Sequence, residues 1–197
     1  RDATGRVLDT RWAQARALQV QVDVDGDGRV RGARVEPGRL QVLDGALRWR
    51  ELRWSAAAAG AAEARAIDAE VEPLDVAATL QRLYPDFGAV GDLRVGARIQ
   101  WRHAERVEAD VVVERLGGDL AIAEDGQRLP LGLTDLRLAL TARDGVWDVT
   151  QALAGAQVGV LAGAQRARGA PTAPWPGADA PLEGVVELRV ANVGVWT

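Results

Sequence analysis

The feature that most constrains the fold of this chain is a two-residue alternation of apolar and polar side chains. It is clearest over residues 129–140, which read Leu-Pro-Leu-Gly-Leu-Thr-Asp-Leu-Arg-Leu-Ala-Leu and contain one slip of the period. The same period returns from near residue 18 almost to the C-terminus. Successive side chains of a β-strand point to opposite faces, so the pattern predicts strands with one apolar and one polar face. The chain is therefore expected to be mainly β, and the central question is what its apolar face covers.

Composition narrows the classes of protein further. The chain has 197 residues, of which 48% are hydrophobic and 26% charged, a balance typical of folded globular proteins. Its formal charge of −4 argues against nucleic acid as a partner, because phosphate binding needs a basic face. Cysteine is absent, which excludes a disulfide framework and a thiolate site. Since the chain starts at Arg1 and lacks Met, we expect a segment of a longer protein, with any signal peptide or membrane anchor outside it.

Turn signals divide the N-terminal part of the chain into hairpins. The sequence Asp-Gly-Asp-Gly at residues 25–28 predicts a tight turn between two strands. In the strand after it, Val30 and Val35 fall at positions of opposite parity, so both can lie on one face only if a bulge near Gly32 shifts the alternation. Residues 55–66 are rich in Ala, which favours a helix, but Gly60 interrupts them and the strand period then resumes. We favour a hairpin there.

Helical spacing is clear in one segment, which runs from Pro73 to Leu83. Its apolar residues recur every three or four positions, as on one face of an amphipathic helix. Proline suits the first helical position, and Pro85 marks the end. The sequence thus predicts a single short helix within a β protein.

Charge predicts the register of the hairpin that follows. Residues 93–102 alternate apolar with mainly basic side chains, and residues 107–114 alternate apolar with acidic ones. If residues 103–105 form the loop, Arg98 faces Asp110 and Arg94 faces Glu114. Opposite charges then meet on one face and apolar side chains on the other.

Shorter stretches with the same period continue the series towards the C-terminus. A long connection rich in Pro and Gly, residues 166–181, precedes the last strand and is expected to be either mobile or pinned by Trp175. Residues 187–190 before Trp196 echo residues 92–95 before Trp101, so a next unit is expected to start near residues 182–197. The strands expected here span residues 120–122, 129–133, 136–140, 146–149, 158–161 and 185–190.

Residues suited to catalysis are scarce, and we expect a protein that is not an enzyme and has no cofactor. Ser55 is the only serine and lacks the glycines of a nucleophile elbow. His103 is the only histidine and lies at the predicted hairpin tip, where a solvated turn residue is the simpler interpretation. Tryptophans make up seven of the nine aromatic residues. Trp49, Trp54 and Trp101 share the apolar parity, so they either pack in a core or line a ligand groove.

The segment Asp23-Val-Asp25-Gly-Asp27-Gly28 matches the first positions of a calcium-binding EF-hand loop. The position that should carry a bidentate Glu is Arg34, and a strand precedes the loop where a helix is required. A hairpin turn rich in Asp and Gly is therefore the favoured interpretation, and no metal site is assigned. A calcium-stabilised β module stays as a third hypothesis.

The chain resembles a known family over roughly residues 67–196. Residues 130–140 are followed by Gly-Val-Trp at 145–147, Ala-Leu-Ala-Gly at 152–155 and Gly-Val-Leu-Ala-Gly at 159–163, then by Ala-Pro-Leu-Glu-Gly at 180–184 and Gly-Val-Trp at 194–196. Upstream stand Glu-Pro-Leu-Asp-Val at 72–76, Tyr-Pro-Asp-Phe-Gly at 84–88 and Gly-Asp-Leu-Arg-Val at 91–95. In texture and spacing these segments are similar to the TamB family, the inner-membrane subunit of the translocation and assembly module, in the AsmA-like superfamily.

The resemblance implies a fold and a role. Members of this family are anchored in the inner membrane and extend across the Gram-negative periplasm. They curl one long sheet into a U-shaped β-taco with an apolar trough, and they are associated with phospholipid transport and outer-membrane protein assembly. The partner is an outer-membrane barrel, TamA, expected to bind outside this segment. On this basis residues 1–197 form one β-taco segment that contacts the membrane through an anchor outside it.

A one-faced apolar sheet must stack on a second sheet, close as a barrel or curl around an apolar ligand. The leading hypothesis is a non-enzymatic hydrophobic groove for phospholipid acyl chains or unfolded outer-membrane strands. The alternative is a structural or adhesive β-sandwich or β-solenoid surface module without a lipid groove. The residues predicted to line the groove are Val20, Val22, Val24, Trp49, Leu93, Val95, Ile99, Trp101, Val107, Val111, Val113, Leu131, Leu133, Leu136, Leu138, Leu140, Val186, Leu188 and Val190.

Overall fold

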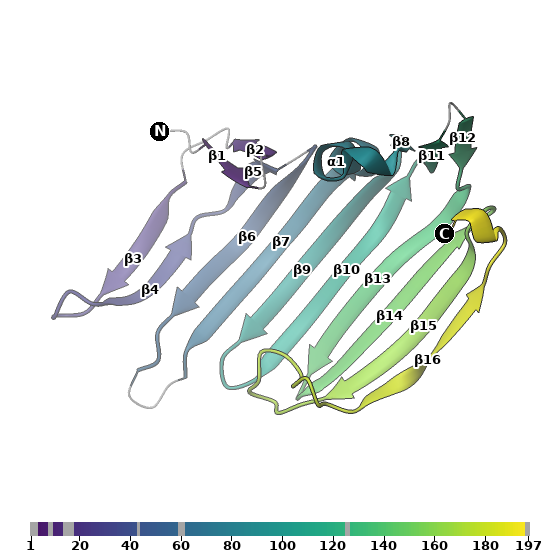
Figure 1. Ribbon diagram of the computed structural model, residues 1–197. Helices are drawn as coiled ribbons and strands as arrows, with labels where there is room; N and C mark the ends of the chain where they lie inside the picture. Colours follow the sequence, from purple (N-terminus) through teal and green to yellow (C-terminus); the bar gives the residue numbers. More distant parts are fainter. Residues whose placement is uncertain are drawn as a thin grey trace.

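The structure, a computed structural model, is mainly β and describes residues 4–7, 10–13, 18–42, 44–58, 62–124 and 127–195. Thirteen strands form one antiparallel sheet, and three short strands form a second sheet beside it (Figure 1). The large sheet has the order β1-β2-β5-β6-β7-β9-β10-β13-β14-β15-β16, and the hairpin β3–β4 joins it at β6. Within the described residues it is an open sheet and not a closed barrel.

Most neighbours in the large sheet follow each other along the chain, as expected for hairpins joined by short turns. Its strands are β1 (Thr4–Val7), β2 (Thr10–Ala13), β3 (Val20–Val24), β4 (Val30–Val35), β5 (Gly38–Val42), β6 (Gly45–Ser55), β7 (Ala64–Asp75), β9 (Arg94–His103), β10 (Val107–Gly117), β13 (Leu133–Arg143), β14 (Val146–Gly155), β15 (Gly159–Arg168) and β16 (Leu182–Arg189). The small sheet has the order β12-β11-β8, from β8 (Ala89–Gly91), β11 (Leu120–Glu124) and β12 (Gln127–Pro130). The helices are α1 (Val76–Leu83) and two 3-10 turns, Pro85–Phe87 and Val193–Val195.

The two faces of the large sheet differ sharply in chemistry. Cross-strand partners share a face, so the register gives rows of side chains that run across the sheet. One row pairs Leu52 with Ile67, Ile67 with Trp101, and continues through Ala109 and Ala142 to Trp147. We call the face that carries this row the apolar face. The opposite, polar face carries ion pairs that link neighbouring strands, including Arg39–Glu72, Arg48–Glu72, Arg94–Asp75, Arg137–Glu114 and Arg166–Asp148.

The slips of the alternation are β-bulges that keep the apolar side chains on one face. On β13 the partner of Leu133 is Gly155 and the partner of Asp135 is Ala154, so Thr134 is the extra residue. On β4 the register shifts at Arg31, next to Gly32, which confirms the predicted bulge. The hairpin predicted around Gly60 also forms, between β6 and β7; Gly60 itself lies outside the described residues.

Two predictions about element boundaries were wrong. The helix starts at Val76 and not at Pro73, because β7 continues to Asp75, whose carboxylate caps the helix by accepting a hydrogen bond from the Ala78 N–H at 2.9 Å. Residues 129–133 are not one strand, since β12 ends at Pro130 and the chain turns at Gly132, with φ of 64°, before β13.

The predicted register of the β9–β10 hairpin is shifted by two residues. Its loop is residues 104–106, so His103 pairs with Val107 and Arg98 faces Val112 instead of Asp110. A shift of two preserves which face each side chain occupies, so the alternation could not reveal it. Only Arg102 faces an acidic residue of β10, Glu108. The acidic partners of the other two arginines lie on β7, where Arg98 faces Glu70 and Arg94 forms its ion pair with Asp75 at 3.0 Å.

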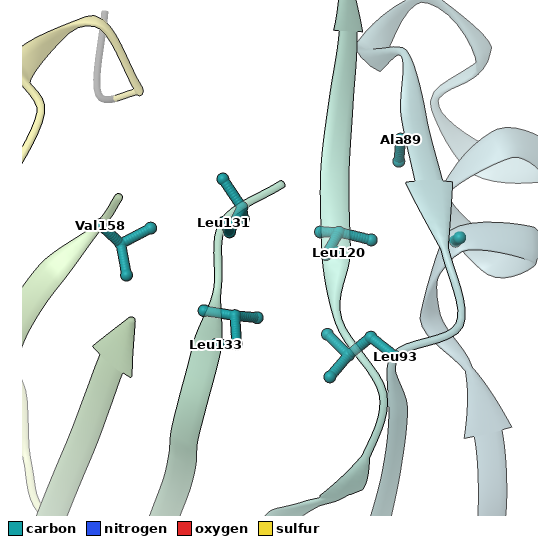
Figure 2. Packing of buried hydrophobic residues seen from close by; sticks show 7 residues of the cluster. Ala89, Leu93, Leu120, Leu131, Leu133 and Val158 are labelled. Atoms are coloured by element: carbon teal, nitrogen blue, oxygen red, sulfur yellow. The ribbon is translucent and has the colours of Figure 1, made fainter. Parts of the chain in front are cut away.

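Two parts of the chain fold back over opposite ends of the strands (Figure 1). At one end, α1 and the small sheet enclose a cluster in which Leu93 and Leu120 point towards Leu131 and Leu133 (Figure 2). At the other end, residues 169–181 follow β15 and lie against the turns of neighbouring hairpins. A second cluster, of Val107, Ala109, Ala142 and Trp147, is buried there.

Candidate functional site

The candidate site is the part of the apolar face that lies between these two covers. Here the side chains of the central strands remain accessible although they are aliphatic or aromatic. Ile67 on β7 is 37% exposed and Leu138 on β13 is 47% exposed. Contiguous exposed apolar area of this kind marks a binding surface.

A cavity of about 650 Å³ forms at the end of the face nearest residues 169–181. Its floor comes from the strands β4, β6, β7, β9 and β10, and Pro174 and Trp175 close one side. The volume lies within the range of about 300–1,000 Å³ that is typical of small-molecule sites. Its lining residues are Ala33, Val35, Leu52, Arg53, Trp54, Arg65, Ala66, Ile67, Ile99, Trp101, Val111, Pro174 and Trp175.

The predicted groove residues divide into three groups. Ile99, Trp101 and Val111 line the cavity. Others lie on the apolar face along the sheet, from the exposed Val20, Val22 and Val24 on β3 through Val113, Leu136, Leu138 and Leu140 to Val186 and Leu188 on β16, with Val190 just beyond it. The third group is covered: Leu93, Leu131 and Leu133 are in the cluster under α1 and the small sheet, with Val95 packed against it, Val107 is in the second cluster, and Trp49 is 3% exposed.

The predicted groove contains three of the thirteen residues that line the cavity. Trp54 on β6 had the alternative of core or groove, and the structure places it in the cavity wall with Leu52. Their adjacency to Ile99 and Trp101 depends on the order β6-β7-β9, which the alternation does not reveal. Trp175 had been singled out as a residue that could pin its segment. Its position over the sheet depends on a contact with Trp147, 28 residues earlier, and no local pattern encodes that contact.

A small polar cluster stands at the mouth of the cavity. The Glu63 carboxylate accepts hydrogen bonds from the Arg65 guanidinium at 2.9 and 2.7 Å and from the Trp54 indole N–H at 2.6 Å. The bonds from Arg65, and then that from Trp54, hold the pKa of Glu63 below its ordinary value. An ionised Glu63 therefore fixes both Trp54 and Arg65 at this edge.

At the end of β9 nearest residues 169–181, two polar side-chain atoms are buried without a hydrogen-bond partner. They are the indole N–H of Trp101 and Nδ1 of His103, whose rings lie 5.7 Å apart. The other ring nitrogen of His103 contacts the carbonyl oxygen of Thr172 at 3.0 Å. Unpaired buried polar atoms are uncommon and costly, so they mark a place where the local structure is not optimised for stability alone.

The Asp-Gly turn is held by its own carboxylate. Asp25 accepts hydrogen bonds from the backbone N–H groups of Asp27 and Arg29 and from the Arg31 side chain at 2.8–3.0 Å. The bond from Arg29 is the main reason why the pKa of Asp25 is lowered. No group of three His, Cys, Asp or Glu within the described ranges is placed to hold a metal ion.

Ser55 and His103 do not come together as a catalytic pair. Trp54 pairs with Arg65 and Arg65 with His103, so these three side chains share the apolar face. Ser55 follows Trp54 on the same strand and points to the opposite face.

Comparison of the chain with models of protein families, with curated proteins and with solved structures finds no match. Among the helices that the structure describes, none has the length and apolar character needed to cross a bilayer.

Proposed function

We propose that this chain is a segment of a periplasm-spanning TamB-like protein of the AsmA-like superfamily, anchored in the inner membrane. Its apolar face would carry phospholipid acyl chains between the inner and outer membranes, assist outer-membrane protein assembly, or do both, without making or breaking a bond. The observation that carries the proposal is the continuity of this face. From β3 to β16 every strand with described side chains turns apolar residues to the same side, and the middle of that side is uncovered.

An apolar face of this extent favours an apolar occupant. Each methylene of an acyl chain that leaves water contributes about 0.8 kcal/mol, so a chain laid along the face gains several kilocalories per mole even when only part of it is in contact. The polar face offers no such gain, because Arg and Asp/Glu pairs cover it. The sheet can thus hold a lipid chain on one side and meet water on the other.

Curling of the sheet into a U-shaped trough belongs to this proposal. An open sheet with an apolar face shields an acyl chain from one side, whereas a trough shields it from three. The exposed apolar residues at both ends of the sheet, such as Val22 on β3 and Val186 on β16, would then face each other across the trough. A TamA-like outer-membrane barrel remains the proposed partner, through a region outside this segment.

Site-specific photocrosslinking in cells tests the proposal. A photoreactive amino acid at Leu138, on the open part of the apolar face, should yield adducts with phospholipid. The matched control is Thr150 on the neighbouring strand β14, an exposed residue of the polar face. Lipid adducts from Leu138 and none from Thr150 support the groove. Equal yields from both positions, or no adduct from Leu138, would count against it.

A further inference from the structure

Residues 169–181 differ from an ordinary surface loop because two hairpins hold them in place. The Gly169 N–H donates to the carbonyl oxygen of Gly145 in the β13–β14 turn at 2.8 Å. The Val107 N–H donates to the carbonyl oxygen of Pro171 at 2.9 Å, and His103 contacts that of Thr172. We call this segment the strap. Its anchors lie on two separate hairpins, so the strap crosses the strand ends in a fixed direction (Figure 1).

The tip of the strap brings an aromatic ring over the apolar face. Trp175 lies against Trp147 with ring centroids 5.3 Å apart and an angle of 30° between the planes. Trp147 is 3% exposed, whereas Trp175 is still 62% exposed. Part of the Trp175 ring thus contacts Trp147 on the sheet. The remainder of the ring is exposed and lines the cavity together with Trp101.

We infer that the strap converts this end of the apolar face into a discrete site for one unbranched aliphatic chain, with Trp175 as its lid. The inference rests on the proposed function and deepens it. Elsewhere on the face a chain could slide along open sheet, but here it would be held between the floor formed by Ile67, Ile99 and Val111 and the ring of Trp175.

The chemistry of the wall selects an aliphatic chain over a peptide strand. A peptide would bring backbone N–H and C=O groups into the cavity, and each buried group needs a hydrogen-bond partner. The only polar side-chain groups of the lining are donors, on two arginines and the tryptophans, and Arg65 and Trp54 are already bonded to Glu63. The N–H groups of a peptide would therefore find no acceptor among these side chains. A methylene chain has no such requirement. Its polar end can rest at the mouth beside Glu63 and Arg65, where water is accessible.

The strap is also suited to opening. Its closed position coincides with two unpaired buried atoms, the Trp101 N–H and His103 Nδ1, in the strand end to which it is anchored. Movement of the strap would admit water to these atoms, which offsets part of the contact that is lost. Because the gain and the loss partly cancel, the strap can open to release the aliphatic chain as well as close to retain it.

Titration of the whole chain with stearic acid that carries bromine in mid-chain tests the inference, because bromine quenches tryptophan fluorescence on contact. We expect saturation with one molecule per chain. Trp175→Ala should weaken binding on the order of tenfold, as for truncation of an aromatic that closes a pocket, and Trp175→Phe should restore most of it. Trp175→Phe keeps a ring against Trp147, so it should leave the melting temperature unchanged, and it separates the loss of the lid from a loss of packing in Trp175→Ala.

Val185→Ala is the matched control, since Val185 lies on the same strand, β16, but on the polar face, where it is 68% exposed and outside the cavity. It should bind the probe as the unaltered chain does. If Trp175→Ala binds as tightly as the unaltered chain, the strap site is overturned while a uniform groove stands. If Val185→Ala weakens binding as much as Trp175→Ala does, the loss is not specific to the strap, and the strap site is overturned as well. If no variant and not even the unaltered chain binds the probe, the proposed function fails together with the strap site.

Discussion

Two parts of the apolar face are built from the same kinds of residue but have opposite exposures. They are its open middle and the end beneath α1 and the small sheet, which we call the covered end. Leu133 and Leu138 lie on the same strand, β13, and on the same face, yet Leu133 is 6% exposed and Leu138 is 47% exposed. Leu93, beneath α1, is 2% exposed, and Leu188 on β16 is 52% exposed. Strand pattern alone therefore decides which face a side chain occupies, whereas its burial depends on what folds back over it.

The cover is made of connections between neighbouring strands of the large sheet. Residues 76–91 between β7 and β9 supply α1 and β8, and residues 118–132 between β10 and β13 supply β11 and β12. By contrast, β13 and β14 are joined by the two residues Asp144 and Gly145, which cannot cover anything. These two long connections cover one end of the face, residues 169–181 between β15 and β16 cover the other, and the middle stays open, an arrangement suited to a groove closed at both ends.

Leu93→Ala should have the largest effect on the free energy of unfolding, because it opens a cavity in the covered cluster. Truncation of a fully buried Leu costs about 2–5 kcal/mol. The matched variant Leu188→Ala changes the same residue type on the open part of the face, where surface substitutions stay within about 0.5 kcal/mol. Urea unfolding of both variants measures the contrast. Similar losses would show that the covered end is no better packed than the open one.

Gly118→Ala should be the next most destabilising, since Gly118 starts the connection that builds the cover. Its φ is +73°, and a Cβ there would overlap the backbone carbonyl group of Asp92. Strain of this kind costs on the order of 1–3 kcal/mol. Gly26→Ala is the control, because a Cβ at Gly26 meets nothing within 4 Å. A stability equal to that of the unaltered chain for Gly118→Ala would mean that the connection can be rearranged freely.

Asp119→Ala should loosen the cover with a smaller effect. The Asp119 carboxylate accepts hydrogen bonds from the backbone N–H groups of Gly132 and Leu133 at 2.9 and 2.8 Å, and so ties the start of β13 to β11. Loss of the carboxylate leaves both N–H groups without their acceptor, which should lower the free energy of unfolding by about 1–2 kcal/mol. Hydrogen exchange of the Leu133 amide should accelerate relative to that of Leu138. Asp135→Ala, on an exposed carboxylate, should change neither quantity.

The sequence predicted the faces well and the covers poorly, for a physical reason. Parity is a local property, so the alternation predicted the bulge near Gly32, the apolar face and three lining residues of the cavity, Ile99, Trp101 and Val111. The strands of the small sheet are three to five residues long, too short for a period to be distinctive. The turn at Gly132 was concealed because apolar residues continue the alternation on both sides of it.

Long-range contacts were beyond prediction for a different reason. The position of Trp175 over Trp147 depends on anchors supplied by two hairpins far from it in the sequence. The β9–β10 register depends on whether the three-residue loop starts at residue 103 or 104, and both choices give the same faces. Local patterns carry neither kind of information.

Acidification should separate the two faces with the smallest of these effects. The Arg166 guanidinium lowers the pKa of Asp148, and the Arg39 guanidinium lowers that of Glu72, both on the polar face. A carboxylate whose pKa is lower in the folded state stabilises the fold above its unfolded pKa, about 4, and this contribution is lost as the pH falls through the folded value. The melting temperature should therefore fall as the pH is lowered from roughly 5 to 2. Asp148→Asn should make that fall slightly smaller. Thr150→Ala, on the same strand and face, is the control and should leave it unchanged. A fall that Leu93→Ala alters and Asp148→Asn does not would place the acid sensitivity at the covered end and not on the polar face.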